Sequence, residues 1–388
     1  MFNILTYNNI SPIGLNRFPS EQYKVAADVA QPDAIMLRSF KLHGIAIPES
    51  VKAVGRAGAG VNNIPVAEYT KLGIPVFNAP GANSNAVAEL AIAGMLLASR
   101  HIPAALSYVS GLTGDDESMN ADVEKHKSNF AGFEIEGKTL GVLGLGAIGV
   151  KVVNSAAALG LNTIGFDPFI SLQNAWKLNS LTVPAANIDD VVSQSDFISL
   201  HIPLNEKTKN LFSKEHIARI KKGATLLNFS RAGVVDEAAI VEALNAGDLH
   251  FYVCDFPSPA LINHPRAIAL PHLGASTEEA EENCAVMVAD QIRDFLEQGI
   301  IRNSVNFPEV AIPLTEDCVR ITITNQNIPG VVGHVSSVLG DASINIVDLT
   351  NKSHADVAYT LIDVSGEVPA EIVEKLRAVE GVLSVRII

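Results

Sequence analysis

The sequence predicts an α/β protein that has two doubly wound parallel-sheet domains and a C-terminal domain of order βαββαβ. Three observations support this class. Short apolar runs alternate with helix-like segments as far as residue 308, a pattern typical of parallel sheets covered by helices. The chain has 388 residues, which is too many for one ordinary core. Beyond residue 316 the order becomes strand, helix, strand, strand, helix, strand, as in ferredoxin-like domains.

Composition excludes several classes of protein. With 48% hydrophobic and 18% charged residues, the chain has the composition of a folded globular protein. Its net charge of −14 argues against nonspecific binding to nucleic acid or to an anionic membrane. The three cysteines are far apart and lack metal-ligand spacing, so we expect the reducing cytoplasm, no disulfide and no metal. We find no apolar run of membrane-spanning length and no signal-peptide pattern.

The first domain is predicted to be flavodoxin-like, with four parallel strands. These strands are Phe2–Thr6, Ala34–Leu37, Val51–Val54 and Pro75–Phe77. Ligands of such sheets bind at the carboxyl ends of the strands. The groups expected at that edge are Arg38, Lys41, Arg56, Gly58, Ala59, Gly60 and Asn78. The basic side chains are candidates for binding an anionic substrate, although a basic residue at a strand end is often only a solvated surface group.

Two segments precede the second domain. Ser84–Arg100 is apolar on nearly all sides, which predicts a buried helix between the domains. Glu89 would lie inside this helix and act as a buried acceptor of interdomain hydrogen bonds. Gly111–Gly132 is polar and charged, so we expect a mobile excursion there.

A glycine-rich turn predicts a dinucleotide site. The apolar strand Thr139–Leu143 precedes it, the helix Ile148–Leu159 follows it, and Gly144, Gly146 and Gly149 have the spacing G-x-G-x-x-G. Gly144 allows the tight turn, Gly146 lets a pyrophosphate approach the backbone, and Gly149 lets the helix pack closely against the strand. The phosphates would bind at the N-terminus of the helix.

The second, Rossmann-like sheet continues beyond this turn. Asp167 follows the strand Asn162–Phe166; its carboxylate would accept hydrogen bonds from both ribose hydroxyls and repel a 2′-phosphate, which favours NAD over NADP. Further predicted strands are Phe197–His201, Ala224–Phe229, Phe251–Cys254 and Ala267–Leu270. Predicted helices are Val235–Leu244 and Thr277–Leu296, after which Ile301–Phe307 returns to the first domain and Val310–Thr315 is a linker.

The C-terminal domain is predicted from six segments. The strands are Cys318–Thr324, Ile344–Leu349, Ala355–Asp363 and Leu383–Ile388. The helices are Pro329–Leu339 and Pro369–Val379.

Two residues could supply carbonyl–alcohol chemistry beside a nicotinamide. His272 follows the strand Ala267–Leu270, and imidazole exchanges protons near neutral pH. Arg231 follows another strand, and its planar fork suits a carboxylate together with a carbonyl oxygen. A lone histidine after a strand is more often structural, and His201 and His264 compete for the same role.

These motifs together resemble the D-2-hydroxyacid dehydrogenase family over essentially the whole chain. The matching stretches are the glycine fingerprint with Asp167, Val54–Pro65, Asn228–Glu237, Pro271–Asn283 and Asn303–Pro308. The resemblance implies that Arg231 orients the substrate and that His272 is the acid/base. It also implies a substrate domain of residues 1–101 and 285–308, an inserted NAD-binding domain of residues 102–284, and a homodimer or homotetramer. The implied NAD-binding residues are Gly144, Gly146, Ala147, Ile148, Gly149, Asp167, His201, Pro203, Thr208, Ser230 and Asp255.

One departure from the family pattern concerns the partner of His272. In most relatives a glutamate holds the histidine in its productive tautomer, but the matching segment here is CDFPSP, with Ser258 at that position if no gap is allowed. A shift of one residue aligns Asp255 and Phe256 with the Asp and Phe of the family segment and still leaves no acid at the glutamate position. We hypothesise that Asp255 or another nearby acid substitutes for it. Smaller departures are Ala147, where many relatives carry arginine, and Asn62-Asn63, where they carry Asp-Asn.

Residues 317–388 resemble an ACT domain, a small-molecule sensing module. The segments NQNIPG and SINIV carry this resemblance. It implies an amino-acid effector bound by pairs of domains through Asn325, Asn327 and Asn345. The alternative is a dimerisation module that binds no effector.

The family resemblance implies NAD-dependent oxidation of a phosphorylated 2-hydroxy acid. The expected reaction converts 3-phosphoglycerate to 3-phosphohydroxypyruvate, at the entry to serine biosynthesis. Arg231 and the amides of Gly58–Gly60 would hold the carboxylate, and Arg56 with Arg38 or Lys41 would meet the phosphate. The alternatives are the same chemistry on another small D-2-hydroxy acid, related to glyoxylate or pyruvate, and a non-catalytic NAD-dependent sensor.

Overall fold

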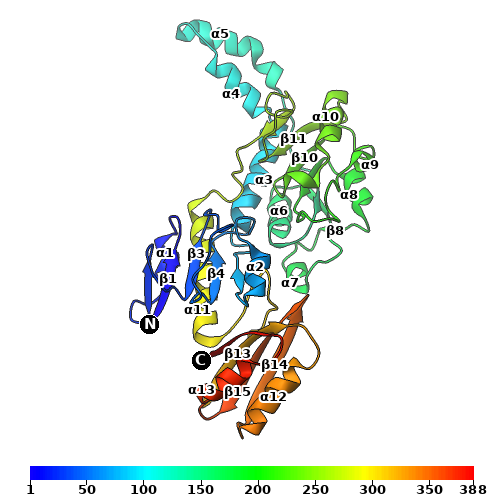
Figure 1. The fold of residues 1–388 in the computed structure, drawn as a ribbon. Helices are drawn as coiled ribbons and strands as arrows, with labels where there is room; N and C mark the ends of the chain where they lie inside the picture. The colour runs from blue at the N-terminus through cyan, green and yellow to red at the C-terminus, as the bar shows by residue number, and fades with distance from the viewer. The chain divides into compact units, whose positions relative to one another are not determined.

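The computed structural model describes residues 1–388, which form two compact units (Figure 1). One unit is Ser84–Thr277, and the other combines Met1–Asn83 with Glu278–Ile388. Each contains a parallel sheet, as predicted. The domain bounds inferred from the family resemblance stay a prediction, because compact units and functional domains need not share their borders.

The unit Ser84–Thr277 contains a seven-stranded sheet in the order β12-β11-β10-β9-β6-β7-β8, with every pair parallel. Its strands are β6 (Thr139–Leu143), β7 (Asn162–Phe166), β8 (Val183–Pro184), β9 (Phe197–Leu200), β10 (Ala224–Asn228), β11 (Leu249–Cys254) and β12 (Ala267–Ala269). The predictions for β6 and β7 are confirmed residue for residue. β8 was not predicted, because two exposed residues, one of them proline, form no apolar run.

Helices cover both faces of this sheet. The helices α3 (Ser84–Ser99) and α6 (Ala147–Ala158) share one apolar cluster with β6, β10 and β11. The helices α8 (Ile188–Gln194) and α10 (Glu237–Ala246) share another with the opposite face. The shorter helices are α7 (Leu172–Ala175), α9 (Lys214–Ile217) and η2 (Ala232–Val234). Because helices cover both faces of the sheet, β9 and β10 are buried along their whole length.

The helix α3 is confirmed, and the interdomain hydrogen bond expected of Glu89 stays a prediction. Within its unit α3 buries one face and leaves Asn85, Glu89, Leu96 and Arg100, the residue after its end, exposed. The Glu89 carboxylate accepts a hydrogen bond of 2.5 Å from Asn85 Nδ2. Packing inside this unit therefore covers only one face of α3.

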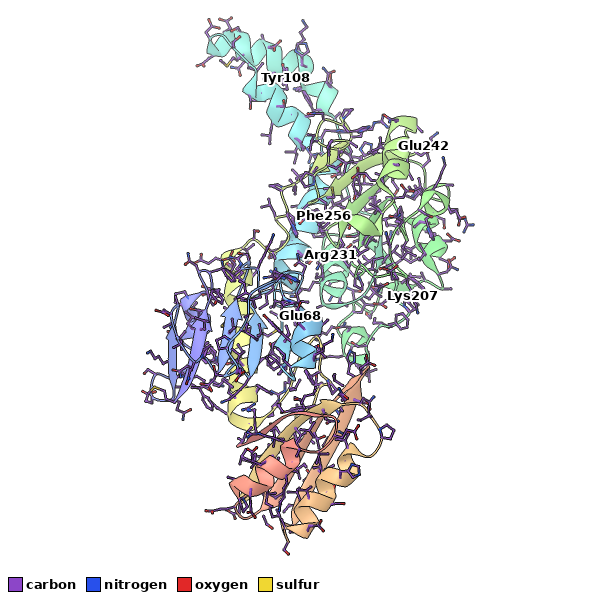
Figure 2. The ribbon with its side chains drawn as sticks, viewed as in Figure 1. Glu68, Tyr108, Lys207, Arg231, Glu242 and Phe256 are labelled. Carbon is purple, nitrogen blue, oxygen red and sulfur yellow. The ribbon has the colours of Figure 1, made fainter.

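A helical arm occupies much of the segment that was expected to be an excursion. It consists of α4 (Ile102–Ser110), α5 (Asp116–His126) and the short η1 (Lys127–Phe130), and it extends away from the sheet of its unit (Figure 1). No residue of α4 or α5 is buried. Tyr108 joins the two helices by donating a hydrogen bond of 2.8 Å to Asp122 Oδ2 (Figure 2). No single helix of the chain is long and apolar enough to cross a membrane, although α3 and α4, bent by 67°, meet that criterion when taken together.

The other unit is built on a five-stranded parallel sheet in the order β2-β1-β3-β4-β5. Its strands are β1 (Phe2–Thr6), β2 (Tyr23–Ala26), β3 (Ala34–Leu37), β4 (Ala53–Arg56) and β5 (Val76–Phe77), and its short helices are α1 (Pro12–Leu15) and α2 (Val66–Lys71). The predictions for β1 and β3 are confirmed, and β4 begins two residues later than predicted. The edge strand β2 was not predicted, because only Tyr23 of its four residues is buried.

The long helix α11 (Glu278–Gln298) packs against this sheet. Its buried stripe includes Val288, Ile292 and Phe295. Gly55 of β4 lies directly beneath it, since a Cβ atom there would crowd the Val288 and Ile292 side chains. The glycine thus allows the helix to lie close to the strand that carries Arg56.

The C-terminal domain has the predicted βαββαβ order. Its antiparallel sheet, β14-β15-β13-β16, consists of β13 (Cys318–Gln326), β14 (Ile346–His354), β15 (Val357–Ser365) and β16 (Val382–Ile387). The helices α12 (Val331–Asp341) and α13 (Ala370–Arg377) cover one face through a common apolar cluster.

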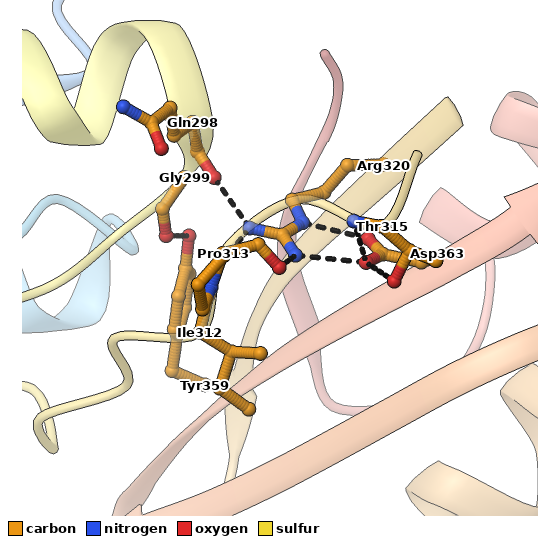
Figure 3. A network of polar contacts seen from close by, with 8 residues as sticks. All are labelled: Gln298, Gly299, Ile312, Pro313, Thr315, Arg320, Tyr359 and Asp363. Carbon is orange, nitrogen blue, oxygen red and sulfur yellow. Dashed lines mark hydrogen bonds and ion pairs between the residues drawn. The ribbon is translucent and has the colours of Figure 1, made fainter. Parts of the chain in front are cut away.

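A buried arginine joins this sheet to the end of α11 and to the linker (Figure 3). Arg320 of β13 is 1% exposed and binds Asp363 of β15 through Nε (2.7 Å) and Nη2 (2.8 Å). It also donates to three backbone carbonyls, those of Gln298, Ile312 and Pro313. Nearby, the Tyr359 hydroxyl donates to the Gly299 carbonyl at 2.6 Å. The predicted linker contains no helix and no named strand, although Val310 forms an isolated bridge with Ile301, and Arg320 binds the carbonyls of Ile312 and Pro313.

Candidate active site

The carboxyl edge of the seven-stranded sheet gathers the predicted site residues of that unit. Because all seven strands are parallel, the residues that follow them meet at one edge. In the order of the sheet these are His272 after β12, Asp255 after β11, Arg231 after β10, His201 after β9, the glycine turn after β6 and Asp167 after β7. His264 precedes β12 and therefore lies at the opposite edge, where its ring contacts Asn245.

The glycine turn has the shape that a pyrophosphate requires. Gly144 has a φ of +93°, and a Cβ atom there would collide with the His201 carbonyl. A Cβ at Gly149 would collide with the Gly144 carbonyl, which explains the close contact between α6 and β6. A Cβ at Gly146 would meet nothing within 4 Å, and Gly146 is the N-cap of α6 without a side-chain cap. The first amides of α6, from Ala147 and Ile148, thus border open space suited to an anion.

Asp167 supports this turn and offers acceptors beside it. Its Oδ2 accepts a hydrogen bond of 2.8 Å from the Leu145 amide, and its Oδ1 accepts one of 2.8 Å from the Phe169 amide. Each carboxylate oxygen has a second lone pair. The position therefore fits the predicted contact with ribose hydroxyls.

Asp255 holds the loop of His272 through the backbone. It is 1% exposed; its Oδ2 accepts from the Gly274 amide at 3.0 Å, and its carbonyl accepts from the His272 amide at 3.0 Å. The hypothesised contact with the imidazole is not formed. His272 has a left-handed φ of +49°, and its exposed ring lies edge-on to Phe256, with 5.4 Å between centroids. Such backbone conformations are strained in residues other than glycine and are frequent at functional sites.

Two side chains at this edge, the buried Asp255 and the half-buried His201, fit the amide end of a nicotinamide cofactor. Asp255 Oδ1 is buried and has no hydrogen-bond partner, which is costly unless a donor such as a carboxamide NH₂ reaches it. The His201 ring contacts the Ser199 hydroxyl at 2.8 Å, and burial lowers the pKa of His201 to about 4. His201 is therefore neutral near pH 7, so it can contact a cofactor without adding charge.

The other predicted cofactor residues lie in turns after β9 and β10. Thr208 donates its hydroxyl hydrogen to the Pro203 carbonyl, and the Ser230 hydroxyl donates to Asn228 Oδ1 at 2.8 Å. Arg231 is exposed and donates from Nη1 to the Ser230 carbonyl at 2.7 Å (Figure 2). Its remaining N–H groups face solvent, so its fork is available to a carboxylate.

The predicted substrate residues lie at the carboxyl edge of the five-stranded sheet, after β3, β4 and β5. Arg56 donates from Nε to the Arg38 carbonyl at 2.9 Å and from Nη1 to the Gly60 carbonyl. Asn78 Nδ2 donates to the Ala59 carbonyl at 2.5 Å. These contacts fix the shape of the glycine-rich loop.

Not every predicted anion ligand at this edge is available. The Gly58 amide donates to the Arg56 carbonyl at 2.7 Å, so it is not open to a substrate carboxylate. Arg38 Nη2 pairs with Glu281 Oε1 at 2.5 Å, whereas Lys41 is exposed and forms no ion pair. Sequence reasoning did not assign Glu281 to this edge, because it is separated from Arg38 by 243 residues and no local pattern links the two.

A cavity of about 990 Å³ in this unit lies away from the predicted substrate residues. Its lining includes Phe2, Lys52, Ile74 and Arg386. The first three lie at the amino ends of β1, β4 and β5, the edge opposite Arg38 and Asn78. The cavity is therefore not the candidate substrate site.

The predicted effector residues do not meet within one C-terminal domain. Asn325 is 2% exposed and donates to the Gln326 carbonyl, and Asn327 donates to the Ala355 carbonyl at 3.0 Å. The Asn345 carbonyl instead accepts from Ser365 at the far end of the sheet, where β13 begins. Only two domains together could combine Asn345 with the other asparagines.

Comparison with known proteins identifies the two kinds of domain. The family model described as D-isomer specific 2-hydroxyacid dehydrogenase, NAD binding domain, matches residues 92–274. The ACT domain model matches residues 319–381.

Several relatives are curated as D-3-phosphoglycerate dehydrogenases. The protein of Haemophilus influenzae is 33% identical over 352 residues, covering 87% of this chain and 81% of that protein. The protein of Methanocaldococcus jannaschii is 40% identical over 268 residues, covering 68% of this chain and 49% of that protein. The chain spans about half the length of the latter and of the relatives from Bacillus subtilis and Synechocystis.

Solved structures support the same family. The NAD⁺-bound 3-phosphoglycerate dehydrogenase of Entamoeba histolytica has a TM-score of 0.60 and 26% identity, covering 79% of this chain and 98% of that chain. A glyoxylate reductase from Paecilomyes thermophila has a TM-score of 0.63 and 28% identity, covering 78% and 98%. Together these matches show that the chain belongs to the D-isomer specific 2-hydroxyacid dehydrogenase family and carries an ACT domain.

Proposed function

We propose that this protein oxidises 3-phosphoglycerate to 3-phosphohydroxypyruvate with NAD, the first step of serine biosynthesis. One observation carries the proposal: a single sheet edge holds His272, the buried acceptor of Asp255, Arg231, the glycine turn and Asp167, in that order along the sheet. The 33% identity to the H. influenzae 3-phosphoglycerate dehydrogenase over most of both chains supports the substrate.

Bound NAD would supply the hydride acceptor for the substrate's C2 hydrogen. Asp167 would accept hydrogen bonds from the ribose and disfavour a 2′-phosphate, and Asp255 Oδ1 would accept one from the carboxamide. The His272 imidazole would take the C2 hydroxyl proton during oxidation and return it during reduction. Arg231 would hold the carboxylate through two N–H groups, which also fixes the orientation of C2. Lys41, Arg38 and Arg56 are the proposed contacts of the phosphate.

The direct test is turnover by the purified protein. Reduction of 3-phosphohydroxypyruvate, pyruvate and glyoxylate is followed by the loss of NADH absorbance. We expect kcat/KM to be highest for the phosphorylated substrate. A preference for pyruvate or glyoxylate would replace this substrate assignment by the second candidate, which the pairing of Arg38 with Glu281 favours.

A His272→Asn variant separates an enzyme from a non-catalytic NAD-dependent sensor. Loss of the proton acceptor should reduce kcat by about 10³-fold or more, while NADH affinity measured by fluorescence stays within about threefold. A wild-type protein that binds NADH but reduces none of the 2-oxo acids would favour the sensor.

The assembly and regulation follow from the same family assignment. We propose a cytoplasmic homodimer or homotetramer, supported by exposed apolar side chains on α3 and α4, namely Leu96, Leu106 and Val109.

An amino-acid effector would bind between two ACT domains through Asn325, Asn327 and Asn345, since these residues are separated within one domain. Sedimentation velocity and titration with L-serine test the two statements.

A further inference from the structure

The ion pair between Arg38 and Glu281 lies where a substrate anion is expected. Arg38 follows β3 at the carboxyl edge of its sheet, and Glu281 lies in the first turn of α11. Arg38 Nη2 and Glu281 Oε1 are 2.5 Å apart, a short charge-assisted contact. The two side chains are 39% and 42% exposed, so ligands in solution can reach both.

Glu281 belongs to the same charged cluster as both arginines of this edge. The Cys284 thiol lies beneath the cluster; burial raises its pKa to about 11, Arg38 and Arg56 oppose that rise, and Glu281 adds to it. The Arg56 side chain is bound to the Arg38 carbonyl at 2.9 Å. A ligand that binds Arg38 therefore also approaches the Glu281 carboxylate.

The ion pair between Glu281 and Arg38 is not explained by the usual preference for acidic residues in the first turn of a helix. Acidic side chains are stabilising near a helix N-terminus wherever they point, and Glu278 and Glu279 already supply that effect in α11. Glu282, the next residue, forms no ion pair, whereas Glu281 contacts the one arginine that follows β3. Glu281 is thus distinguished by its partner and not by its position in the helix.

We propose that Glu281 is a specificity-determining residue that competes with the substrate phosphate for Arg38. The inference rests on the proposed function, which supplies a phosphorylated substrate. A phosphate monoester carries a charge of about −2 at neutral pH and would have to displace the carboxylate or bind beside it. Glu281 therefore weakens binding of the phosphorylated substrate and leaves that of its unphosphorylated counterpart nearly unchanged.

The kinetic test compares two neutralising variants on one turn of α11. Glu281→Gln should lower KM for 3-phosphohydroxypyruvate about tenfold, with kcat and the KM for hydroxypyruvate within about twofold. Glu282→Gln makes the same change in net charge at a residue without an ion pair and should leave both KM values unchanged. Glu281→Asp keeps the charge and should resemble the wild type. High salt should reduce the effect of Glu281→Gln, since the pair is partly exposed.

A titration with inorganic phosphate tests the competition without turnover. By calorimetry, Glu281→Gln should bind phosphate about tenfold more tightly than the wild type. Adding Arg38→Gln to the wild type or to Glu281→Gln should abolish phosphate binding in each protein. Equal phosphate affinity in Glu281→Gln and Glu282→Gln would overturn the inference. If the wild type reduces no phosphorylated substrate but the phosphate result holds, the proposed function fails and the competition at Arg38 stands.

Discussion

At the residue scale, Asp255 shows how one buried carboxylate can position a loop. Its side chain binds the Gly274 amide and its carbonyl binds the His272 amide, so the two bonds lie on either side of the proposed acid/base. The imidazole itself is left without a carboxylate. Within this unit, the orientation of the ring depends on the backbone of His272 and on its contact with Phe256.

His201 predicts how stability depends on pH. Its pKa is lowered to about 4 by burial, against about 6.5 in an unfolded chain. The unfolded state then binds more protons between these values, so the stabilisation is complete above pH 6.5 and is lost as the pH falls towards 4. Between pH 7 and pH 5 this residue should remove about 2 kcal/mol from the free energy of unfolding.

Urea unfolding of the wild type and His201→Gln at both pH values measures this contribution. On acidification from pH 7 to pH 5, the free energy of unfolding should fall by about 2 kcal/mol less in His201→Gln than in the wild type. His354→Gln, at an exposed position of β14, is the control and should behave like the wild type. An equal loss in all three proteins would show that His201 is not the group responsible.

At the scale of elements, two glycines of one turn have different physical roles. A Cβ at Gly149 would collide with the Gly144 carbonyl, whereas a Cβ at Gly146 would meet no protein atom within 4 Å. We expect Gly149→Ala to lower the free energy of unfolding by about 2 kcal/mol or more. Gly146→Ala should leave stability nearly unchanged and weaken NADH binding about tenfold or more, because the methyl group occupies the pyrophosphate space.

Thermal unfolding and NADH fluorescence titration, applied to both variants, separate the two roles. A large loss of stability in Gly146→Ala, or full NADH affinity in that variant, would contradict the assignment of open space to the phosphates. The strands around this turn were predicted correctly because β6 is mostly apolar and leads into the glycine turn, and because β7 lies between Gly160, which follows α6, and Asp167. The edge strands β2 and β8 were not, since strands with few buried residues carry little apolar signal.

At the scale of the whole molecule, the Arg320–Asp363 pair joins the ACT sheet to the end of α11 and the linker. Arg320 and Asp363 are 1% and 2% exposed as side chains, so removing one partner leaves the other charge buried. Arg320→Met should cost about 3–5 kcal/mol of unfolding free energy, and the double variant Arg320→Met/Asp363→Leu should recover much of it.

Urea unfolding and limited proteolysis of the linker measure this prediction. Arg320→Met should be cleaved faster within residues 310–317, since the carbonyls of Ile312 and Pro313 lose their donor. Arg302→Met, which removes an exposed arginine paired with Asp294, is the control and should cost less than about 1 kcal/mol. Similar losses in both variants would mean that the buried network does not hold the linker.

The sequence by itself determined the fold class, the glycine turn, the family and the positions of most candidate site residues after parallel strands. These features depend on local apolar runs and on short motifs whose geometry follows from the residues within them. Only the tertiary structure decided that Glu89 is exposed, that Asp255 binds backbone amides instead of the imidazole, and that Glu281 pairs with Arg38. Contacts such as that between Glu281 and Arg38 form between residues that are far apart in the sequence, and the exposure of a helical residue depends on what packs against its face. No local sequence pattern contains this information.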